Sequence, residues 1–340
     1  MAALEDIERR RKKARSTYRD VKKHFVRSEG WLPIFRRYAR LRNGNVRYLT
    51  LCAKEAIDVR YFRMKGVLPY DIKQKAYPTV TFVERDTQDY AIIAETLGTT
   101  RLGIKGDLES ILVKPDENAD NSQKLRNSFP YDIINLDFTG EVIRENDPPY
   151  SQTMQAIERI VELQHQSGST GWHMFLTFRA CPQTANHEAD QQIRGIIEAN
   201  FRNAGAVDAY GARPALHELI QDQYEEFLRI GIMKFLAGCA PPRGYEFLPG
   251  GSYTYRRAPG DGDPAYHIVK LIVEFRPIRP PRNIPDPRLA IAAYENSVPR
   301  IFRSQAIDVV IRLDDAATLH RINRDLRPVL DELERLKIVE

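Results

Sequence analysis

The sequence predicts an α/β protein in which helices cover both faces of a mostly parallel sheet that ends in an antiparallel hairpin. Short apolar runs rich in β-branched residues alternate with longer stretches of helical periodicity. Two later strand-like runs are separated only by a turn sequence. The chain has 340 residues, of which 42% are apolar and 29% charged. This composition is typical of a soluble globular protein, and no run approaches the roughly 18 to 20 apolar residues of a membrane span.

Five candidate strands lie between residues 46 and 178. They are Val46–Cys52, Thr79–Val83, Leu102–Lys105, Asp132–Leu136 and Trp172–Phe178. Helical periodicity occupies most of the segments between them, such as Thr87–Leu97 and Ser151–Gln166. Alternation of strand and helix predicts a parallel sheet with helices on both faces.

The spacing changes after Thr184. Two long helical runs, His187–Ala204 and Arg213–Ala237, are followed by strand-like runs at Tyr245–Arg256 and His267–Arg276. Residues 258–264 between these last runs read Ala-Pro-Gly-Asp-Gly-Asp-Pro, which is a turn composition. The two runs are therefore predicted to form the antiparallel hairpin.

The N-terminal segment, residues 1–45, holds all of the basic excess. It has 14 Lys or Arg against 5 Asp or Glu, whereas the whole chain has a net charge of +5. Helix formers dominate from Glu5 to Arg42, with a predicted break near Gly30 and Pro33. The cations that form this basic arm are Arg9, Arg10, Arg11, Lys12, Lys13, Arg15, Lys22 and Lys23. Clustered Lys and Arg suit nucleic-acid phosphates, and the alternatives are an acidic protein partner or a solvated helix.

Residues 277–340 form a proline-rich linker and a mainly helical C-terminal extension. Near its end, apolar residues recur at spacings of three and four, at Leu319, Ile322, Leu326, Val329, Leu333 and Leu336. This seam suits packing on another helix. Because Pro328 interrupts it, we favour a kinked or two-piece helix packed on its own domain over self-association or a partner protein.

The cysteines and histidines do not indicate a metal site or a disulfide framework. Cys52, Cys181 and Cys239 are far apart and lack CxxC spacing, so we expect them to be reduced and buried. The seven histidines are scattered. Because the N-terminus has no apolar segment typical of a secretory signal, a cytoplasmic location is the default expectation.

Acidic residues follow several of the predicted strands directly. Glu84 follows Thr81-Phe82-Val83, the pair Gly106-Asp107 follows the strand at Leu102–Lys105, and Asp137-Phe138 follows Asn135-Leu136. In open α/β sheets, the carboxyl ends of the strands line the crevice that binds ligands. Acids at these points also serve as helix N-caps, so each of them has a purely structural alternative.

The order of these features resembles the class I S-adenosylmethionine-dependent methyltransferases over about residues 46–276. The resemblance implies a Rossmann-like, seven-stranded sheet of five parallel strands closed by an antiparallel hairpin. It also implies that S-adenosylmethionine is the cofactor, that Glu84 holds its ribose, and that Gly106 and Asp107 lie near its adenine. The stretch from Asn135 to Gly140 is similar to the Asp-Pro-Phe/Tyr-Gly motif of some RNA methyltransferases, so Asp137 and Phe138 are expected to face the methyl acceptor.

The loop after the first strand departs from the family pattern. Residues 49–56, Leu-Thr-Leu-Cys-Ala-Lys-Glu-Ala, contain no glycine, whereas a glycine-rich turn normally lets the cofactor approach the backbone. Small Cys52 and Ala53 leave some room, and Glu55 or Asp58 is a candidate for the cofactor's ammonium group. Lys54 would repel a sulfonium cation.

A second string, Asn146-Asp147-Pro148-Pro149-Tyr150, contains the Asp-Pro-Pro-Tyr motif of amino-methylating adenine methyltransferases. It lies ten residues beyond Asp137, whereas that motif directly follows the fourth strand. We therefore interpret it as loop composition that leads into a helix at Ser151, a good N-cap residue.

Two hypotheses for function follow from the sequence. In the first, the protein acts on nucleic acid and transfers a methyl group from S-adenosylmethionine. In the second, it is a catalytically inactive methyltransferase-fold subunit that serves as a binding or assembly module in a larger complex.

Overall fold

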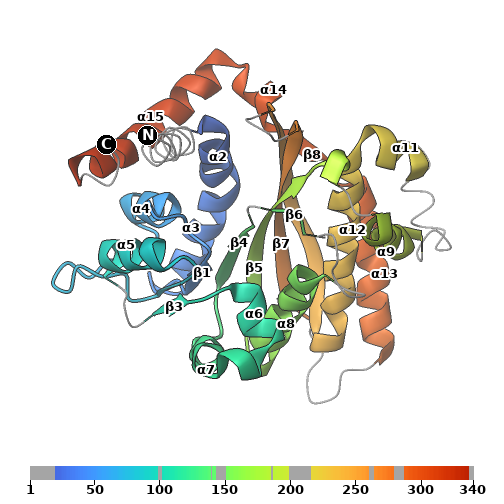
Figure 1. The fold of residues 1–340 in the computed structure, drawn as a ribbon, viewed down its shortest axis with the longest axis horizontal. Helices are drawn as coiled ribbons and strands as arrows, with labels where there is room; N and C mark the ends of the chain where they lie inside the picture. The colour runs from blue at the N-terminus through green and yellow to red at the C-terminus, as the bar shows by residue number, and fades with distance from the viewer. Residues whose placement is uncertain are drawn as a thin grey trace, which may run out of the picture.

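The computed structural model describes residues 20–98, 102–138, 140–142, 151–184, 187–198, 216–259, 264–278 and 287–336. Within these ranges the protein has a mixed α/β architecture, with one eight-stranded sheet between two layers of helices (Figure 1). The sheet has one strand more than the seven that the resemblance implied. The strands are β1 Tyr48–Thr50, β2 Val80–Glu84, β3 Gly103–Lys105, β4 Ile133–Asp137, β5 Trp172–Ala180, β6 Tyr245–Arg257, β7 Tyr266–Pro277 and β8 Ala306–Asp308.

The strand order across the sheet is β3-β2-β1-β4-β5-β7-β6-β8. Strands β1 to β5 run parallel to one another, while β7 runs antiparallel to both β5 and β6. The predicted hairpin of β6 and β7 is therefore confirmed. The additional strand, β8, pairs parallel to β6 at the edge of the sheet.

One face of the sheet carries the first core, which is centred on β4, β5 and the long helix α12. In Figure 1 the helices of this face lie below and to the right of the sheet. They are α6 Leu108–Val113, α7 Ala119–Asn127, α8 Gln152–Gln166, α9 His187–Glu198, α11 Leu216–Asp222, α12 Tyr224–Cys239 and α13 Pro287–Arg303. Three short 3-10 segments are η2 Pro115–Asn118, η3 Pro182–Thr184 and η4 Pro241–Arg243.

The opposite face carries the second core, to which helices from both ends of the chain contribute. They are α2 Val21–Phe25, the π-helix η1 Val26–Trp31, α3 Leu32–Leu41, α4 Ile57–Met64, α5 Thr87–Leu97, α14 Val309–Leu313 and α15 Ala316–Arg335. The indole of Trp31 stacks on Phe175 of β5 at 4.9 Å, and Phe35 stacks on Phe62 of α4 at 3.8 Å. Residues on both sides of the predicted 46–276 domain thus pack directly on its sheet.

The sequence predicted a break near Gly30 and Pro33, but residues 21–41 form a continuous helical segment. The chain passes through the π-helix η1 at Gly30, and Pro33 lies in the first turn of α3, which follows η1 without interruption. Gly30 packs closely on the sheet, because a Cβ atom there would lie 2.8 Å from Ile272 Cδ1. The lack of a side chain therefore serves close packing on the sheet.

Two other helical predictions also differ from the structure. The run at Arg213–Ala237 is divided within its described part at Gln223, between α11 and α12. In contrast, α15 is one continuous helix with Pro328 inside it. Three residues of its predicted seam, Ile322, Val329 and Leu333, lie in the second core, and Leu326 is also buried, so the helix packs on its own chain.

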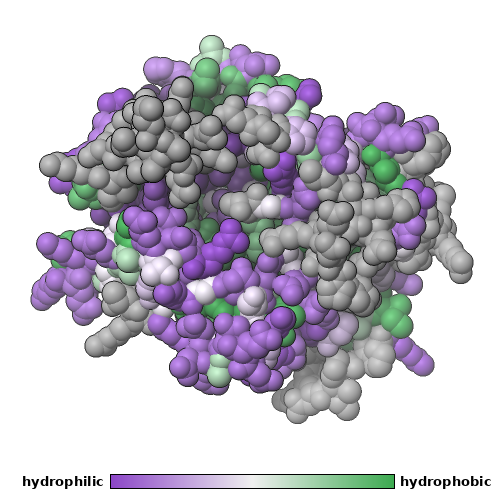
Figure 2. Space-filling view, viewed as in Figure 1, coloured by the Kyte–Doolittle hydropathy of each residue, from purple (hydrophilic) through white to green (hydrophobic). Residues whose placement is uncertain are grey.

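The visible described surface in Figure 2 is mostly hydrophilic, with small hydrophobic areas scattered over it. No described helix is long and apolar enough to cross a membrane. Cys52, Cys181 and Cys239 are buried, as expected, and form no disulfide within the described part of the chain.

Candidate functional site

The site residues expected at the strand ends lie mainly in one transverse line across the sheet. Lys105 pairs with Glu84, Asp137 pairs with Thr177, and Thr177 pairs with Lys270. Cys52, two residues beyond the last paired residue of β1, continues the register between Glu84 and Asp137. We call Lys105, Glu84, Cys52, Asp137, Thr177 and Lys270 the carboxyl-edge row. Because directly paired residues share a face, Glu84, Cys52 and Asp137 all lie on the face of the second core.

Within this row, the charges of Lys270 and Lys23 act on Asp137. Lys270 Nζ lies 3.0 Å from Thr177 Oγ1 next to it, and Lys23 Nζ of α2 lies 4.0 Å from Asp137 Oδ2. Burial alone would raise the pKa of Asp137, but the charges of Lys270 and Lys23 outweigh burial and hold the pKa below its usual range. Asp137 is therefore a carboxylate at neutral pH.

Lys270 is only 2% exposed and lies on the face of Trp31, 5.2 Å from the ring centroid. Burial lowers the pKa of Lys270 to about 8, although the charge of Asp137 acts in the opposite direction. The sequence analysis missed this residue and Thr177. The available signal was a lone lysine inside the apolar strand His-Ile-Val-Lys-Leu-Ile-Val.

The side chain of Phe138 lies on the opposite face of the sheet from that of Asp137. Its backbone N–H donates to Thr177 O at 3.1 Å, and its side chain is buried in the first core, on the opposite face of the sheet. The alternation of side chains at the end of β4 causes this separation. Of the two predicted acceptor residues, only Asp137 lies on the face of the row.

Glu84 lies at the carboxyl end of β2 and is partly buried. Its Oε1 accepts a hydrogen bond from Asp86 N at 2.8 Å. Burial raises the pKa of Glu84 above its usual range, and the charge of Asp89 adds to this effect. The carboxylate keeps capacity for further donors, since an ionised carboxylate has about four acceptor positions.

Gly106 and Asp107 connect β3 to α6. Gly106 has φ +150, and a Cβ atom there would lie 3.0 Å from Ile111 Cδ1, so glycine suits this tight turn. Asp107 is the N-cap of α6, with Oδ2 accepting from Ser110 N at 2.9 Å. Asp107 therefore serves as a helix N-cap, which was the alternative to a ligand-binding role, and one of its carboxylate oxygens is engaged in the cap.

The glycine-free loop after β1 makes its sharp turn at Ala56, which has φ 44 and lies in the left-handed region. This is a position where glycine is usually preferred. Cys52 and Glu55 are buried, while Ala53 is exposed. Burial raises the pKa of the Cys52 thiol well above its usual range, as do the charges of Asp58 and Glu84. An unreactive thiol is expected there.

Asp58 is buried beneath the loop. It accepts hydrogen bonds from Tyr48 Oη at 2.6 Å and Thr50 Oγ1 at 3.1 Å. Asn135 donates to Thr50 Oγ1 at 3.3 Å, and its Oδ1 is buried without a partner among the described residues. An unsatisfied buried acceptor next to the loop is a feature that a bound donor group can satisfy.

The other predicted residues are divided between described and undescribed parts of the chain. Lys22 Nζ donates to Arg256 O at 3.3 Å, so both Lys22 and Lys23 contact the sheet. Arg9, Arg10, Arg11, Lys12, Lys13 and Arg15 lie outside the described residues, as does the string from Asn146 to Tyr150.

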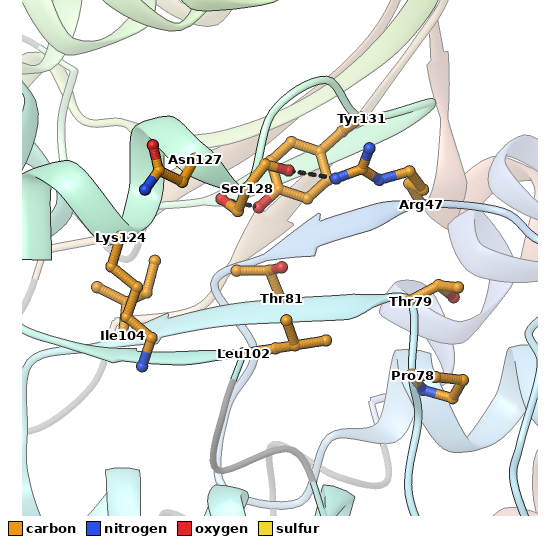
Figure 3. A pocket seen from close by; sticks show the side chains of 10 residues that line it. All are labelled: Arg47, Pro78, Thr79, Thr81, Leu102, Ile104, Lys124, Asn127, Ser128 and Tyr131. Atoms are coloured by element: carbon orange, nitrogen blue, oxygen red, sulfur yellow. Dashed lines mark hydrogen bonds between the residues drawn. The ribbon is translucent and has the colours of Figure 1, made fainter.

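A separate cavity of about 310 Å³ opens at the amino ends of β1, β2 and β3 (Figure 3). Thr79, Thr81, Tyr131 and Ser128 line it, together with the cations Arg47 and Lys124. Both cations are engaged within the protein, Arg47 with Ser128 O at 2.6 Å and Lys124 with Gly103 O. No residue of the carboxyl-edge row lines this cavity. Among the described residues, no group of three or more His, Cys, Asp or Glu could hold a metal ion.

Comparison with known proteins identifies one family. Searches of curated proteins and of solved structures give no match. A profile described as PP_RS20740-like matches residues 103–279, from β3 through β7, which is just over half of the chain. The matched segment contains Asp107, Asp137, Thr177 and Lys270. The protein therefore belongs to the PP_RS20740-like family.

Proposed function

We propose that this protein binds S-adenosylmethionine at the carboxyl-edge row and acts as a methyltransferase on nucleic acid. One observation carries the proposal, namely the position of the row at the reversal of strand order. From β1 the sheet grows through β2 and β3 on one side and through β4 and β5 on the other. In open α/β sheets such a reversal is where ligands bind, outside the carboxyl ends of the strands. Cys52 and Asp137 flank that point.

The strand arrangement also supports the resemblance to class I methyltransferases. Five parallel strands closed by the antiparallel β6–β7 pair form the layout that the resemblance to class I methyltransferases implies. The eighth strand, β8, is an addition outside that layout. The Rossmann-like assignment of the sheet rests on this agreement in order and direction.

The residues present fit S-adenosylmethionine in two respects. Glu84 offers a partly buried carboxylate at the point where the ribose hydroxyls would need an acceptor. Asn135 Oδ1 and the turn at Ala56 provide an unsatisfied acceptor and a tight backbone beside the switch point. Lys54, which would repel a sulfonium, lines a cavity against α4, α5 and α15, and no residue of the carboxyl-edge row lines that cavity. Once bound, S-adenosylmethionine supplies an electrophilic methyl group.

The chain's own residues would then position the acceptor. Asp137, kept ionised by Lys270 and Lys23, can accept a hydrogen bond from an amine or hydroxyl and fix its orientation. Lys23 brings helix α2, which belongs to the basic N-terminal segment, to the same point. That segment is the proposed contact with nucleic-acid phosphates.

A non-catalytic module is the second candidate, and specific observations favour it. The loop after β1 has no glycine, and Phe138 is directed into the opposite core. Asp137 is also already engaged by two cations of the protein itself. In this case the fold would bind a ligand or a partner without transferring a methyl group.

Calorimetry with S-adenosylmethionine and S-adenosylhomocysteine tests the proposal. We expect both to bind, and Glu84→Ala to weaken both by about 10- to 100-fold, because a charged hydrogen bond contributes roughly 1.5–3 kcal/mol. Glu117→Ala is the matched control, since Glu117 is exposed on η2 and, among the described residues, its one ion pair is the exposed one with Lys114. The control should bind as the unmodified protein does.

Absence of heat with either ligand, from protein shown to be folded, would exclude the binding site. Transfer of labelled methyl to RNA or DNA separates the two candidates, because a non-catalytic module binds the cofactor or a partner without transfer. Transfer lost in Asp137→Asn, with cofactor affinity retained, is the result expected of the enzyme.

A further inference from the structure

A basic cavity of about 560 Å³ lies on the outer side of the second core, and no residue of the carboxyl-edge row lines it. It is enclosed by α4, α5, the segment before β2 and the C-terminal helix α15, which lie at the left of Figure 1. Five cations line it, against two carboxylates, Glu95 and Glu332. The cations are Lys54, Arg60, Arg63, Lys75 and Arg335. The lining therefore has an excess of three positive charges.

Two of these cations are fixed in the wall by one buried carboxylate. Glu332 of α15 accepts from Arg60 Nη1 at 3.0 Å and from Arg63 Nη2 at 2.5 Å. Arg60 Nε also donates to Glu55 O at 3.0 Å. Because these partners hold both guanidinium groups in place, the wall is preorganised.

The other three cations are available to a ligand. The side chains of Lys54, Lys75 and Arg335 form no hydrogen bond or ion pair with the part of the chain that the structure describes. Lys75 has φ 50, a left-handed conformation that is uncommon for a residue with a side chain. Its carbonyl packs against Gly98, where a Cβ atom would lie only 2.3 Å away. This backbone packing fixes the position of Lys75 at the rim.

One wall of the cavity is aromatic. The rings of Tyr70 and Tyr77 lie 5.0 Å apart at an angle of 58°, and the Arg63 guanidinium lies 5.3 Å from the Tyr70 ring centroid. Tyr77 is buried, whereas Tyr70 is partly exposed to the cavity. Tyrosine faces and arginine planes are the surfaces on which planar bases stack.

We propose that this cavity binds a nucleotide, either free or as one unit of a nucleic-acid strand. Lys54, Lys75 and Arg335 would contact the phosphate, and Tyr70 the base. A cavity of this volume lies within the range of small-molecule sites. The proposal does not depend on binding of S-adenosylmethionine at the carboxyl-edge row.

Titration of the full chain with uridine 5′-monophosphate, uridine, inorganic phosphate and an eight-residue oligouridylate tests the proposal. We expect uridine and phosphate each to bind at least about tenfold more weakly than the monophosphate, because each lacks one of the two contacts. A pyrimidine is chosen so that the adenosine region of the proposed cofactor site does not contribute. Glu84→Ala should retain the affinity for the monophosphate.

The double variant Lys75→Gln and Arg335→Gln should lower monophosphate affinity at least about tenfold, and Tyr70→Leu should remove the advantage of the monophosphate over inorganic phosphate. Lys73→Gln is the matched control, because Lys73 is exposed in the same turn but does not line the cavity. All of these changes are at surface-accessible side chains, and circular dichroism verifies folding.

Two results would overturn the proposal. One is absence of monophosphate binding to the unmodified chain. The other is equal binding to the folded double variant. The oligouridylate distinguishes a strand from a free nucleotide. If the unmodified chain binds the oligouridylate more tightly than the monophosphate, and the double variant loses this difference in affinity, the ligand is a nucleic-acid strand. If there is no such difference, or the double variant keeps it, the ligand is a free nucleotide.

Discussion

His173 illustrates how one buried side chain couples folding to pH. It is 4% exposed, its Nδ1 lies 3.1 Å from Tyr38 Oη, and its Nε2 lies 3.9 Å from Glu274. Burial lowers the pKa of His173 to about 4, and the charge of Glu274 only partly opposes this. In the unfolded chain the pKa would be about 6.5. Protons therefore bind preferentially to the unfolded chain as the pH falls from about 6.5 toward 4.

We predict that the free energy of unfolding decreases by about 2 kcal/mol between pH 7 and pH 5 because of His173 alone. His173→Gln should remove that part of the decrease, measured by urea unfolding at each pH. Some dependence should remain, because burial also lowers the pKa of His24. His320→Gln, at an exposed site on α15, is the control and should behave as the unmodified protein. An unchanged slope in His173→Gln would show that this interpretation is wrong.

Single residues of the site were only partly predictable from the sequence. Glu84 and Asp137 could be located because each ends an apolar strand, and strand ends share an edge of the sheet. Lys270 could not, because its pairing with Thr177 joins residues 93 positions apart. Phe138 was assigned to the acceptor without knowing the exact end of β4, on which the face of each side chain depends.

At the scale of elements, α9 and α12 pack more closely than their apolar patterns indicate. Gly231 of α12 faces Ile193 of α9, and a Cβ atom at Gly231 would lie 2.3 Å from Ile193 Cγ2. Gly238, on the same helix, is exposed and has no heavy atom within 4 Å of the corresponding position. The two glycines differ in environment but not in backbone conformation.

We predict opposite effects of the same substitution at these two glycines. Gly231→Ala should lower the free energy of unfolding by about 1–3 kcal/mol, because overpacking outweighs the better helix propensity of alanine. Gly238→Ala should raise it by about 0.5–1 kcal/mol. Urea unfolding followed by circular dichroism measures both. If both variants are stabilised, the close contact between α9 and α12 is not real.

Elements with local signals were predicted well, and those without were not. The helix at Thr87–Leu97 matches α5, since Asp86 caps its start and the left-handed Gly98 ends it. Helix α4 was not assigned, because its buried Asp58 and Arg60 disguise its apolar face. The partner of Arg60, Glu332, is 272 residues away. Strand β8 was not assigned either, because its pairing with β6 joins residues far apart in the sequence, such as Ser252 and Ala306.

At the scale of the whole molecule, the two cores share one sheet. The first core contains Trp172, stacked on Phe275 at 4.2 Å, and the second contains Trp31. Neighbouring residues of each strand belong to opposite cores, as Ile133 and Ile134 of β4 do. Loss of the sheet would thus expose both cores together, although the chain was predicted to have separate terminal segments.

We predict that both cores unfold in one cooperative transition. The chain has only two tryptophans, so Trp31→Phe leaves a reporter in the first core, and Trp172→Phe leaves one in the second. In each variant, the urea midpoint from tryptophan fluorescence should coincide with that from circular dichroism. Separate midpoints in either variant would show that one layer of helices unfolds independently.

The packing of Gly30 against Ile272 and Tyr253 also has a consequence for synthesis of the protein. The ribosome completes the first helices long before β6 and β7, whose side chains complete the surface on which η1 rests. At roughly 5–20 residues per second, the delay exceeds about 10 s. Throughout that interval the apolar side of the nascent helix, with Trp31 and Phe35, has no finished sheet to cover it. We therefore expect chaperones that bind exposed apolar helices to bind the nascent chain during this interval.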